Sequence, residues 1–380
     1  MTGRERLLAV LRGEIPDRVP VSFFIQEEFL AYYYPNKEKV DRVKDAVECG
    51  QYFGLDIMPR SREFEYPHFL KRSYPNWELN QEHKKDNDNF WQITTIKTPK
   101  GELKQVKVAP YDKRAGHGLH FSTKEYLIEN ARDFEIFSEY VPELDAATRG
   151  AMREYAVYIN KVVGDIGLAA PWGWSGVYNQ AAEYRNLEKL LIDVYMDKEF
   201  YDAYMEKLTA MMVNYNQAYA DTALDCIGLQ GNIANSSVIG ADYFDEHILP
   251  YEQRLVSAIK DTGAYTLYHN CGKAKVLQQS YVKMGIDIWE TVAEAPFGDN
   301  TLKEAKAAVG DKLILSGNLD QVSFLKTANL KEVENKVIEI VQTGKPGGKY
   351  IFAASDFLEK DTPIENIKKA IEVAKREGKY

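Results

Sequence analysis

Cysteine is scarce in this chain of 380 residues: Cys49, Cys226 and Cys271 are its three cysteines, and they lie far apart in the sequence. An odd, scattered set argues against a disulfide framework and favours a reducing compartment. Apolar runs long enough to span a bilayer are also absent, and the N-terminus opens with a helix start, the capping box of Thr2 and Glu5, in place of an export signal. We therefore expect a cytoplasmic protein.

Basic residues are also fewer than acidic ones. The chain has 48 Lys and Arg and 57 Asp and Glu, which give a formal net charge of -9. Nucleic-acid binders normally carry a basic face, and anionic membrane surfaces attract basic proteins. We therefore expect neither kind of partner. A phosphate-binding loop is absent as well, since the glycine- and lysine-rich stretch 344–349 has the wrong spacing and is followed by Tyr350 in place of Ser or Thr.

What the chain does contain is a series of short apolar runs rich in strand-forming residues, separated mostly by helical patterns. The predicted strands are residues 19–24, 55–59, 165–170, 227–231, 265–271, 286–290, 312–317 and 350–354. Segments 243–260 and 302–309 carry apolar residues at helical spacing. This alternation is typical of a parallel sheet with right-handed crossovers, and eight such units predict an α/β fold, the (β/α)8 TIM barrel.

The long gap between the second and third predicted strands breaks this alternation. Residues 90–96 and 103–108 have the pattern of two strands, with Gly101 in the turn between them, so we predict a β-hairpin inserted into the barrel. The last helix is predicted to begin at Thr362 and Pro363. No internal repeat or low-complexity linker divides the chain, and residues 1–380 are predicted to form a single domain.

The fifth predicted strand ends with His269 and Cys271. Residues two apart in a strand project from the same face, so the imidazole and the thiol can share one ion. A nitrogen and a sulfur ligand suit zinc, and such a pair normally needs a third ligand from elsewhere in the chain. The alternative is that the two residues simply end a buried strand, because free cysteine is often buried.

Asp356 is the candidate for the third ligand, since it follows the eighth predicted strand. Active sites of (β/α)8 barrels lie at the carboxyl ends of the strands, where His269 and Cys271 are also predicted to lie. Together the three side chains would form a zinc site with one open position, as a catalytic zinc requires. The alternative role for Asp356 is that of a loop or helix-capping acid.

Several motifs resemble the uroporphyrinogen decarboxylase superfamily. They lie at residues 3–6, 11–13, 16–21, 53–56, 243–251, 317–320 and 362–366 and so extend over nearly the whole chain. The resemblance implies a (β/α)8 barrel, in agreement with the strand count. The superfamily contains the decarboxylases of the haem pathway and also zinc-dependent methyltransferases that act with corrinoid proteins.

The two branches of the superfamily differ in their motifs. Decarboxylases carry Arg-Gln-Ala-Gly-Arg after the first strand, whereas residues 22–28 here read Ser-Phe-Phe-Ile-Gln-Glu-Glu, whose acids would repel a polycarboxylate. The methyltransferases carry His-any-Cys after the fifth strand, as His269 and Cys271 do here. They also carry a further Cys shortly before a Thr-Pro-any-Glu-Asn helix start, and that position is Asp356 in this chain. The resemblance therefore implies a methyltransferase metal site with one changed ligand.

The exchange of a thiolate for the carboxylate of Asp356 makes the site harder and more tolerant of oxygen ligands. Related members remove methyl groups from methoxylated aromatic compounds, with zinc as a Lewis acid on the ether oxygen. We therefore expect this chain to be an O-demethylase that passes the methyl group to a Co(I) corrinoid (cobalamin). The alternatives are transfer from methyl-corrinoid to a thiol such as coenzyme M or to a folate, and a tetrapyrrole-binding or decarboxylase-like barrel.

The corrinoid is expected on a separate partner protein. Many corrinoid proteins hold cobalt with an Asp-any-His-any-any-Gly signature, and none of the six histidines here lies in such a sequence. The partner would then dock over the barrel mouth. The sequence specifies neither the donor nor the oligomeric state, and a homodimer is one option.

Other residues near the predicted strand ends are candidates for substrate contact. Aromatic side chains after the third strand could wall a planar ligand, although a chain with 25 tyrosines places aromatics near any strand end. These aromatics are Trp172, Trp174, Tyr178 and Tyr184, and the amides after the fourth strand are Gln230, Asn232 and Asn235.

Acidic residues and one more amide follow the sixth and seventh predicted strands. Glu290 and Glu294 follow the sixth strand, and Glu290 is predicted to be catalytic, as a fourth zinc ligand or as the donor of a proton to the leaving phenolate. Asn318 and Asp320 follow the seventh strand in a turn shared across the superfamily. For these two a structural role and a substrate contact are both open.

Overall fold

The computed structural model describes residues 1–37, 39–61, 64, 66–112, 117–118 and 121–380. The chain forms two compact units. The first, which we call the barrel unit, contains residues 1–63, 152–176 and 216–380, and the second, the inserted unit, contains residues 64–151 and 177–215. In the described part of the chain no helix is long and apolar enough to cross a membrane.

The barrel unit contains a parallel sheet of five strands. In chain order these are β6 (Cys226–Gln230), β7 (Tyr265–His269), β8 (Ile288–Val292), β9 (Ile314–Leu319) and β10 (Tyr350–Ala354). They are paired in the order β10-β9-β8-β7-β6, so each strand lies beside the next in the sequence. All five were predicted from the sequence, with ends that differ by at most two residues from those observed.

Three short extended segments continue this sheet into a ring. Val21 forms a parallel bridge with Phe352 of β10, Ile57 forms one with Gly167, and Trp172 forms one with Gly228 of β6. The backbone nitrogen of Asp56 donates a hydrogen bond of 2.8 Å to the carbonyl oxygen of Val21, which joins the first two segments. Together the bridges and this bond link eight chain segments in a closed circle, and the predicted (β/α)8 barrel is confirmed.

The first three segments are shorter than predicted. They are held by isolated bridges, because each pairs with its neighbours over only a few residues. The third one begins later than predicted, since Gly164–Ile166 forms a turn of 3-10 helix, η2. The prediction of a strand from residue 165 was therefore wrong at its start.

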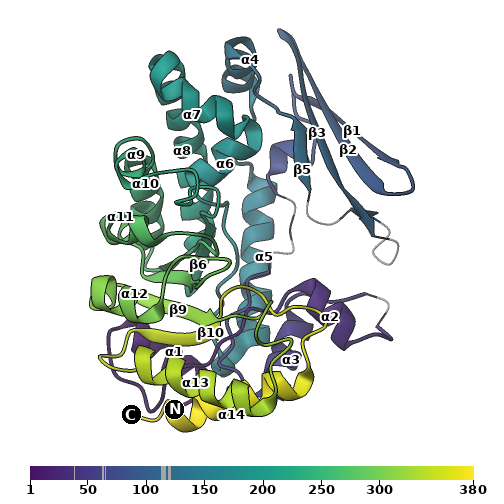
Figure 1. The fold of residues 1–380 in the computed structure, drawn as a ribbon. Helices are drawn as coiled ribbons and strands as arrows, with labels where there is room; N and C mark the ends of the chain where they lie inside the picture. The colour runs from purple at the N-terminus through teal and green to yellow at the C-terminus, as the bar shows by residue number, and fades with distance from the viewer. Residues whose placement is uncertain (38, 62–63, 65, 113–116, 119–120) are drawn as a thin grey trace. The chain divides into compact units, whose positions relative to one another are not determined.

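Helices of the barrel unit alternate with these strands. They are α1 (Gly3–Leu11), α2 (Glu27–Tyr33), α3 (Lys44–Phe53), α9 (Ala241–Tyr243), the π-helix η3 (Phe244–Ile248), α10 (Leu249–Lys260), η4 (Lys275–Leu277), α11 (Gln278–Met284), α12 (Leu302–Val309), α13 (Leu330–Gly344) and α14 (Ile364–Glu377). Figure 1 shows α10, α11 and α12 following one another along the outside of the sheet. The predicted helices 243–260 and 302–309 and the predicted start of the last helix are confirmed.

Apolar side chains from around the ring meet in the barrel interior. This cluster contains Leu7, Val10, Met58, Leu168, Ala170, Cys226, Leu267, Ile288, Ile314 and Ile351. Leu7 and Val10 come from α1, so this helix contributes to the same core as the strands. Because side chains alternate along a strand, the cluster also identifies which later residues of each strand face the interior.

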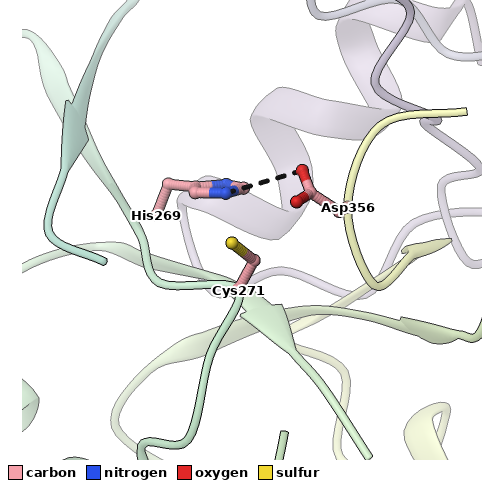
Figure 2. A group of neighbouring side chains, drawn as sticks. All are labelled: His269, Cys271 and Asp356. Atoms are coloured by element: carbon pink, nitrogen blue, oxygen red, sulfur yellow. Dashed lines mark ion pairs between the residues drawn. The ribbon is translucent and has the colours of Figure 1, made fainter. Parts of the chain in front are cut away.

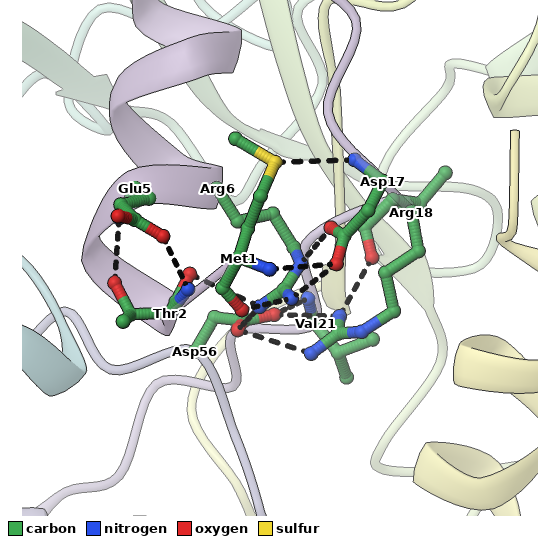
Figure 3. Close-up of polar contacts among 9 residues, drawn as sticks. Met1, Thr2, Glu5, Arg6, Asp17, Arg18, Val21 and Asp56 are labelled. Atoms are coloured by element: carbon green, nitrogen blue, oxygen red, sulfur yellow. Dashed lines mark hydrogen bonds and ion pairs between the residues drawn. The ribbon is translucent and has the colours of Figure 1, made fainter.

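A buried carboxylate, Asp56, ties α1 to the first two segments (Figure 3). Arg6 of α1 donates to its Oδ1 at 2.6 Å, and Arg18 and the backbone nitrogen of Val21 donate to its Oδ2 at 2.7 and 2.8 Å. Asp56 is 2% exposed, and a carboxylate so deeply buried is stable only when it is paired in this way. Three of the motifs that resemble the uroporphyrinogen decarboxylase superfamily thus meet in one ion network.

The inserted unit contains an antiparallel sheet. Its strands are β1 (Glu78–Lys85), β2 (Asn89–Thr98), β3 (Gly101–Asp112), β4 (His117–Gly118) and β5 (Ser122–Glu125). β2 and β3 pair with Ile96 opposite Leu103 and with Gly101 beside the turn, so the predicted hairpin is confirmed as part of a larger sheet. The unit also contains η1 (His68–Leu70), α4 (Ala131–Tyr140), α6 (Val177–Tyr184) and α7 (Leu187–Met196).

Two long helices, α5 (Ala146–Val163) and α8 (Lys198–Ala220), each have residues in both units. The single domain expected over residues 1–380 therefore stays a prediction.

Candidate metal centre

The carboxyl ends of β7 and β10 carry the three predicted ligands. Leu267 of β7 belongs to the interior cluster, so His269, two residues later, faces the barrel interior as well. Cys271 follows directly after this strand. Asp356 lies two residues after the end of β10, where its Oδ1 accepts a hydrogen bond of 2.8 Å from the backbone nitrogen of Phe357.

The three side chains meet in space (Figure 2). One ligand atom from each of His269, Cys271 and Asp356 can be chosen so that all lie within 4.8 Å of one another. The Nε2 atom of His269 is 3.6 Å from Oδ1 of Asp356, and the two side chains are 8% and 22% exposed. A nitrogen, a sulfur and an oxygen donor therefore converge at a site that solvent can still reach.

Glu290 of β8 contacts the opposite side of the His269 ring. Its Oε2 is 3.2 Å from Nδ1 of His269, and its Oε1 accepts a hydrogen bond of 2.6 Å from Nη2 of Arg60. Glu290 and Arg60 are 3% and 4% exposed, and Arg60 also donates to the carbonyl oxygen of Met58 at 2.6 Å. Because a carboxylate accepts from Nδ1, the proton of a neutral His269 lies there and Nε2 faces Asp356 with a lone pair.

Neighbouring charges shift the pKa values of Glu290 and His269. Burial alone would raise the pKa of Glu290, but the Arg60 guanidinium and His269 outweigh it and lower the pKa to about 2. Burial alone would lower the pKa of His269, but Cys271, Glu290 and Asp356 outweigh it and raise the pKa to about 10. An ionised Glu290 that accepts hydrogen bonds from Arg60 and from Nδ1 of His269 has no proton to donate. These contacts suit a positioning role, and the catalytic role that we predicted for Glu290, as a fourth zinc ligand or as a proton donor, stays a prediction.

Two aromatic side chains pack against the ring of His269. The ring centroid of Trp172 is 5.7 Å from that of His269, and the Phe24 centroid is 6.4 Å from it. Phe24 also contacts Trp172 and Phe357, with centroids 5.7 and 6.4 Å apart. Trp172 is thus a predicted aromatic residue that the structure places beside His269, a candidate ligand.

The other predicted aromatic residues are packed inside their units. Trp174, Tyr178 and Tyr184 are 2% exposed or less. Trp174 belongs to the barrel unit, and Tyr178 and Tyr184 belong to the inserted unit. Their role as walls for a substrate stays a prediction.

The predicted amides lie at the end of β6 and in the loop after it. Gln230 is exposed and pairs in register with His269 of β7. Asn232 is exposed, and Asn235 accepts from the backbone nitrogen of Ser237 at 3.0 Å and donates to the carbonyl oxygen of Asn232 at 2.9 Å. Asn235 therefore stabilises its own loop, which leaves Gln230 and Asn232 as the exposed candidates for substrate contact.

Sequence reasoning missed three residues of this site: Arg60, Phe24 and Phe357. A usable signal existed for each of them. Arg60 follows the second predicted strand, Phe24 ends the first, and Phe357 is next to Asp356, so all three lie at carboxyl strand ends. The sequence gives no indication, however, that Arg60 pairs with Glu290.

Two further predicted acids have contacts of their own. Asp320 accepts hydrogen bonds of 2.9 and 2.8 Å from the backbone nitrogens of Val322 and Ser323, which is a turn-stabilising role. Glu294 is 3.5 Å from Nζ of Lys336. Neither contact reaches the metal ligands.

The protein is an α/β barrel with a candidate metal centre. Three possible ligands converge at the carboxyl ends of its parallel strands. A family model described as uroporphyrinogen decarboxylase (URO-D) matches residues 158–377, which is more than half of the chain. The chain belongs to this family.

Known proteins of two kinds are similar to this chain. Methylcobamide:CoM methyltransferase MtbA of Methanosarcina mazei is 22% identical over 261 residues, which cover 67% of this chain and 71% of that protein. A uroporphyrinogen decarboxylase of Solibacter usitatus is 24% identical over 220 residues, covering 56% and 59%. A solved structure, a methyltransferase from Methanosarcina mazei, has a TM-score of 0.69 at 16% identity and covers 99% of both chains. The structural likeness shows the fold.

Proposed function

We propose that this protein is a zinc-containing methyltransferase that transfers a methyl group between a small molecule and the corrinoid of a partner protein. The observation that carries the proposal is the convergence of His269, Cys271 and Asp356 within 4.8 Å at the barrel mouth. The name of the similar Methanosarcina mazei protein, a methylcobamide:CoM methyltransferase, supports the reaction type.

The donor set fits zinc. Imidazole, thiolate and carboxylate are all zinc ligands, and three protein ligands leave the open position of a catalytic site. His269 has the further carboxylate contact, to Glu290, that orients metal-binding histidines in proteins. Zinc held there would supply a Lewis acid that polarises the atom to which the methyl group is attached or transferred.

The remaining residues prepare the site for this chemistry. Glu290 fixes the ring of His269 so that Nε2 is directed at Asp356, and Arg60 keeps Glu290 ionised. Phe24, Trp172 and Phe357 supply apolar surface next to the ligands, which excludes water and suits a planar group. The chain's own contribution is thus to orient the ligands and to shield the reacting atoms.

We favour a methoxylated aromatic compound as the methyl donor, in an O-demethylation reaction. The carboxylate of Asp356, in place of a second thiolate, makes the site better suited to oxygen than to sulfur ligands. The second candidate is methylation of a thiol, and the names of the relatives favour it: a methylated-thiol–coenzyme M methyltransferase of Methanosarcina mazei is 23% identical over 179 residues, covering 47% of this chain and 45% of that protein.

Decarboxylation of a porphyrinogen is a weaker candidate, although decarboxylases are also among the relatives. Residues 26–28, where α2 begins, are Gln26, Glu27 and Glu28. Glu27 forms an ion pair of 2.5 Å with Arg42. A helix start with two carboxylates does not attract a substrate that carries many negative charges.

The first experiment measures zinc per chain in the native protein and in Asp356→Ala, together with methyl transfer from methoxybenzenes to Co(I) cobalamin and from methylcobalamin to thiols. We expect about one zinc per native chain, and loss of both zinc and transfer in Asp356→Ala. Glu294→Gln is the matched control and should keep both, because Glu294 lies two residues after the end of β8 and its ion pair is with Lys336. A native protein without zinc, or an Asp356→Ala variant that keeps it, would contradict the proposal.

A further inference from the structure

Cys271 lies beyond the strand that carries the neighbouring candidate ligand. β7 ends at His269, and residues 270–275, which we call the Cys271 loop, lead from this strand into η4. The position of a ligand in a loop depends on the contacts that hold the loop, because loops are more mobile than strands. The contacts of the Cys271 loop therefore decide how closely the thiol stays with the other two candidate ligands.

Asn270 holds the inner part of the Cys271 loop and is fully buried. Its backbone nitrogen donates to the carbonyl oxygen of Glu290 at 2.6 Å, and its Oδ1 accepts from the backbone nitrogen of Gly272 at 3.1 Å. Its Nδ2 donates to the hydroxyl of Tyr281 at 2.7 Å. The backbone is thus hydrogen-bonded on each side of Cys271.

Asp299, in the loop after β8, holds the outer part of the Cys271 loop. Its Oδ1 accepts from the backbone nitrogens of Ala274 and Lys275 at 2.8 and 3.0 Å. Oγ of Ser236, in the loop after β6, donates to its Oδ2 at 3.4 Å. The backbone nitrogen of Ser236 also donates to the carbonyl oxygen of Lys273 at 2.7 Å. Three neighbouring loops therefore meet at one carboxylate, and three successive residues of the Cys271 loop are held there.

The loop that carries Asp299 is itself closed at its base. The backbone nitrogen of Asn300 donates to the carbonyl oxygen of Ala293 at 3.0 Å. Oδ1 of Asn300 accepts from Nε2 of Gln278 in α11 at 2.7 Å, and both of these side chains are buried. Asp299 thus has a fixed place from which it can hold the Cys271 loop.

Asp320 provides a comparison within the same barrel. It also accepts from two backbone nitrogens, those of Val322 and Ser323, but both belong to the loop after β9 in which Asp320 itself lies. The two backbone nitrogens that Asp299 accepts from belong to a different loop, the one that carries a candidate ligand. The two acids thus make the same kind of bond, and they differ in which loop the bond holds.

We propose that Asp299 is a positioning residue for Cys271, which sets where the thiol lies relative to His269 and Asp356. The proposal rests on the proposed function in that the thiol is taken to be a zinc ligand. Asp299 acts through the backbone of the Cys271 loop, and its negative charge strengthens the hydrogen bonds that it accepts. A ligand that is held in place by its surroundings binds a metal more tightly than one that must first be ordered.

The first test measures how fast iodoacetamide alkylates Cys271 in the metal-free full chain, with the modified residue identified by mass spectrometry. Cys271 is half-buried, whereas Cys49 and Cys226 are buried, so the reagent should reach Cys271 first. Without Asp299 the loop should open more often. We therefore expect alkylation to be roughly tenfold faster in Asp299→Ala, as expected for the loss of charge-assisted hydrogen bonds. Asp320→Ala, the matched control, should react at the native rate.

The second test measures metal binding by the same variants. We expect the affinity for zinc, measured by competition with a chelator, to fall by roughly 10- to 100-fold in Asp299→Ala and to stay unchanged in Asp320→Ala. Co²⁺ is the spectroscopic probe, because a bond between cobalt and a thiolate gives a charge-transfer band in the near ultraviolet. This band should weaken in Asp299→Ala and stay at native strength in Asp320→Ala.

A conservative variant and unfolding measurements separate positioning from a merely structural role. Asp299→Asn keeps an oxygen acceptor without the charge, so its alkylation rate and zinc affinity should lie between those of the native protein and Asp299→Ala. It also carries the test if Asp299→Ala does not fold. Denaturant unfolding should show a similar loss of stability in Asp299→Ala and Asp320→Ala, since each loses hydrogen bonds of the same kind. Native alkylation rate and zinc affinity in both Asp299 variants would overturn the proposal.

The alkylation measurement needs neither metal nor methyl transfer. If Asp299→Ala exposes Cys271 and Asp320→Ala does not, but the native protein binds no zinc, the positioning of the thiol stands and the proposed function fails. If the native protein binds zinc and transfers methyl groups, but Asp299→Ala matches it in alkylation and zinc affinity, the proposed function stands and the positioning role fails.

Discussion

Glu290 shows how one buried carboxylate links charge to geometry at the site. It lies between Arg60 and His269, with contacts of 2.6 and 3.2 Å, and it is almost completely buried. The pair of Arg60 and Glu290 keeps a negative charge fixed behind the imidazole. That charge fixes the direction of Nε2 and, under the proposed function, would strengthen the imidazole as a metal ligand.

Replacing Glu290 by Gln should therefore weaken metal binding without removing a ligand. The amide has nearly the same shape but no charge, so His269 keeps at most a neutral acceptor and Arg60 loses its counter-ion. We expect the affinity for zinc to fall by roughly 10- to 100-fold, measured by competition with a chelator. Glu294→Gln is the control for loss of an acid near a strand end. An unchanged affinity in Glu290→Gln would argue against a positioning role.

At the scale of elements, the contact between β7 and the residue after β6 holds the strand of His269 in place. A Cβ atom on Gly231 would lie 2.0 Å from the ring of Tyr268, the residue before His269. The backbone nitrogen of Gly231 also donates to the carbonyl oxygen of His269 at 2.9 Å. Glycine is required here because the tyrosine ring occupies the space of a side chain.

Gly231→Ala should accordingly destabilise the barrel unit and disturb the metal ligands together. The added methyl group forces the buried Tyr268 ring to move, which should cost about 1–3 kcal/mol in the free energy of unfolding. Gly240→Ala is the matched control in the same loop, since nothing lies within 4 Å of its Cβ position. Denaturant unfolding and zinc affinity are the measurements, and equal effects of the two variants would contradict the expectation.

Some elements of the barrel have clear local sequence patterns, and others do not. Strands β6 to β10 are continuous apolar runs with clear ends, and they were predicted closely. The segments around Val21, Ile57 and Gly167 pair over few residues, so their ends have no strong local pattern. The pair of His269 and Cys271 followed from alternation along one strand, whereas Asp356 became the favoured third ligand through the family resemblance. The contact of Arg60 with Glu290 depends on the folded barrel, which local patterns do not contain.

At the scale of the whole molecule, the inserted unit has an ion and hydrogen-bond cluster of its own. Asp145 accepts from the hydroxyl of Tyr74 and the backbone nitrogen of Thr148, both at 2.7 Å, and lies 3.4 Å from Arg72. Burial alone would raise the pKa of Asp145, but these contacts outweigh it and lower the pKa to about 2. The ionised carboxylate therefore contributes to stability in this unit.

The stabilisation by Asp145 should depend on pH in a defined window. Because its pKa is lower in the folded state, its contribution is fully present above the ordinary aspartate pKa of about 4 and is lost as the pH falls through about 2. Asp145→Asn should thus be less stable than the native protein at neutral pH, and the difference should shrink towards pH 2. Denaturant unfolding at several pH values measures this, with Glu78→Gln, an exposed acid of β1, as the control. A constant difference would contradict the expectation.

The closure of the barrel also determines when the candidate metal centre is assembled during protein synthesis. The bridge between Val21 and Phe352 joins one of the first segments of the chain to β10, the last strand, and Asp356 follows that strand. A growing chain on the ribosome therefore exposes His269 and Cys271 before either the final strand or the third ligand exists. The three side chains of the candidate site are therefore all present only after β10 and Asp356 have been synthesised.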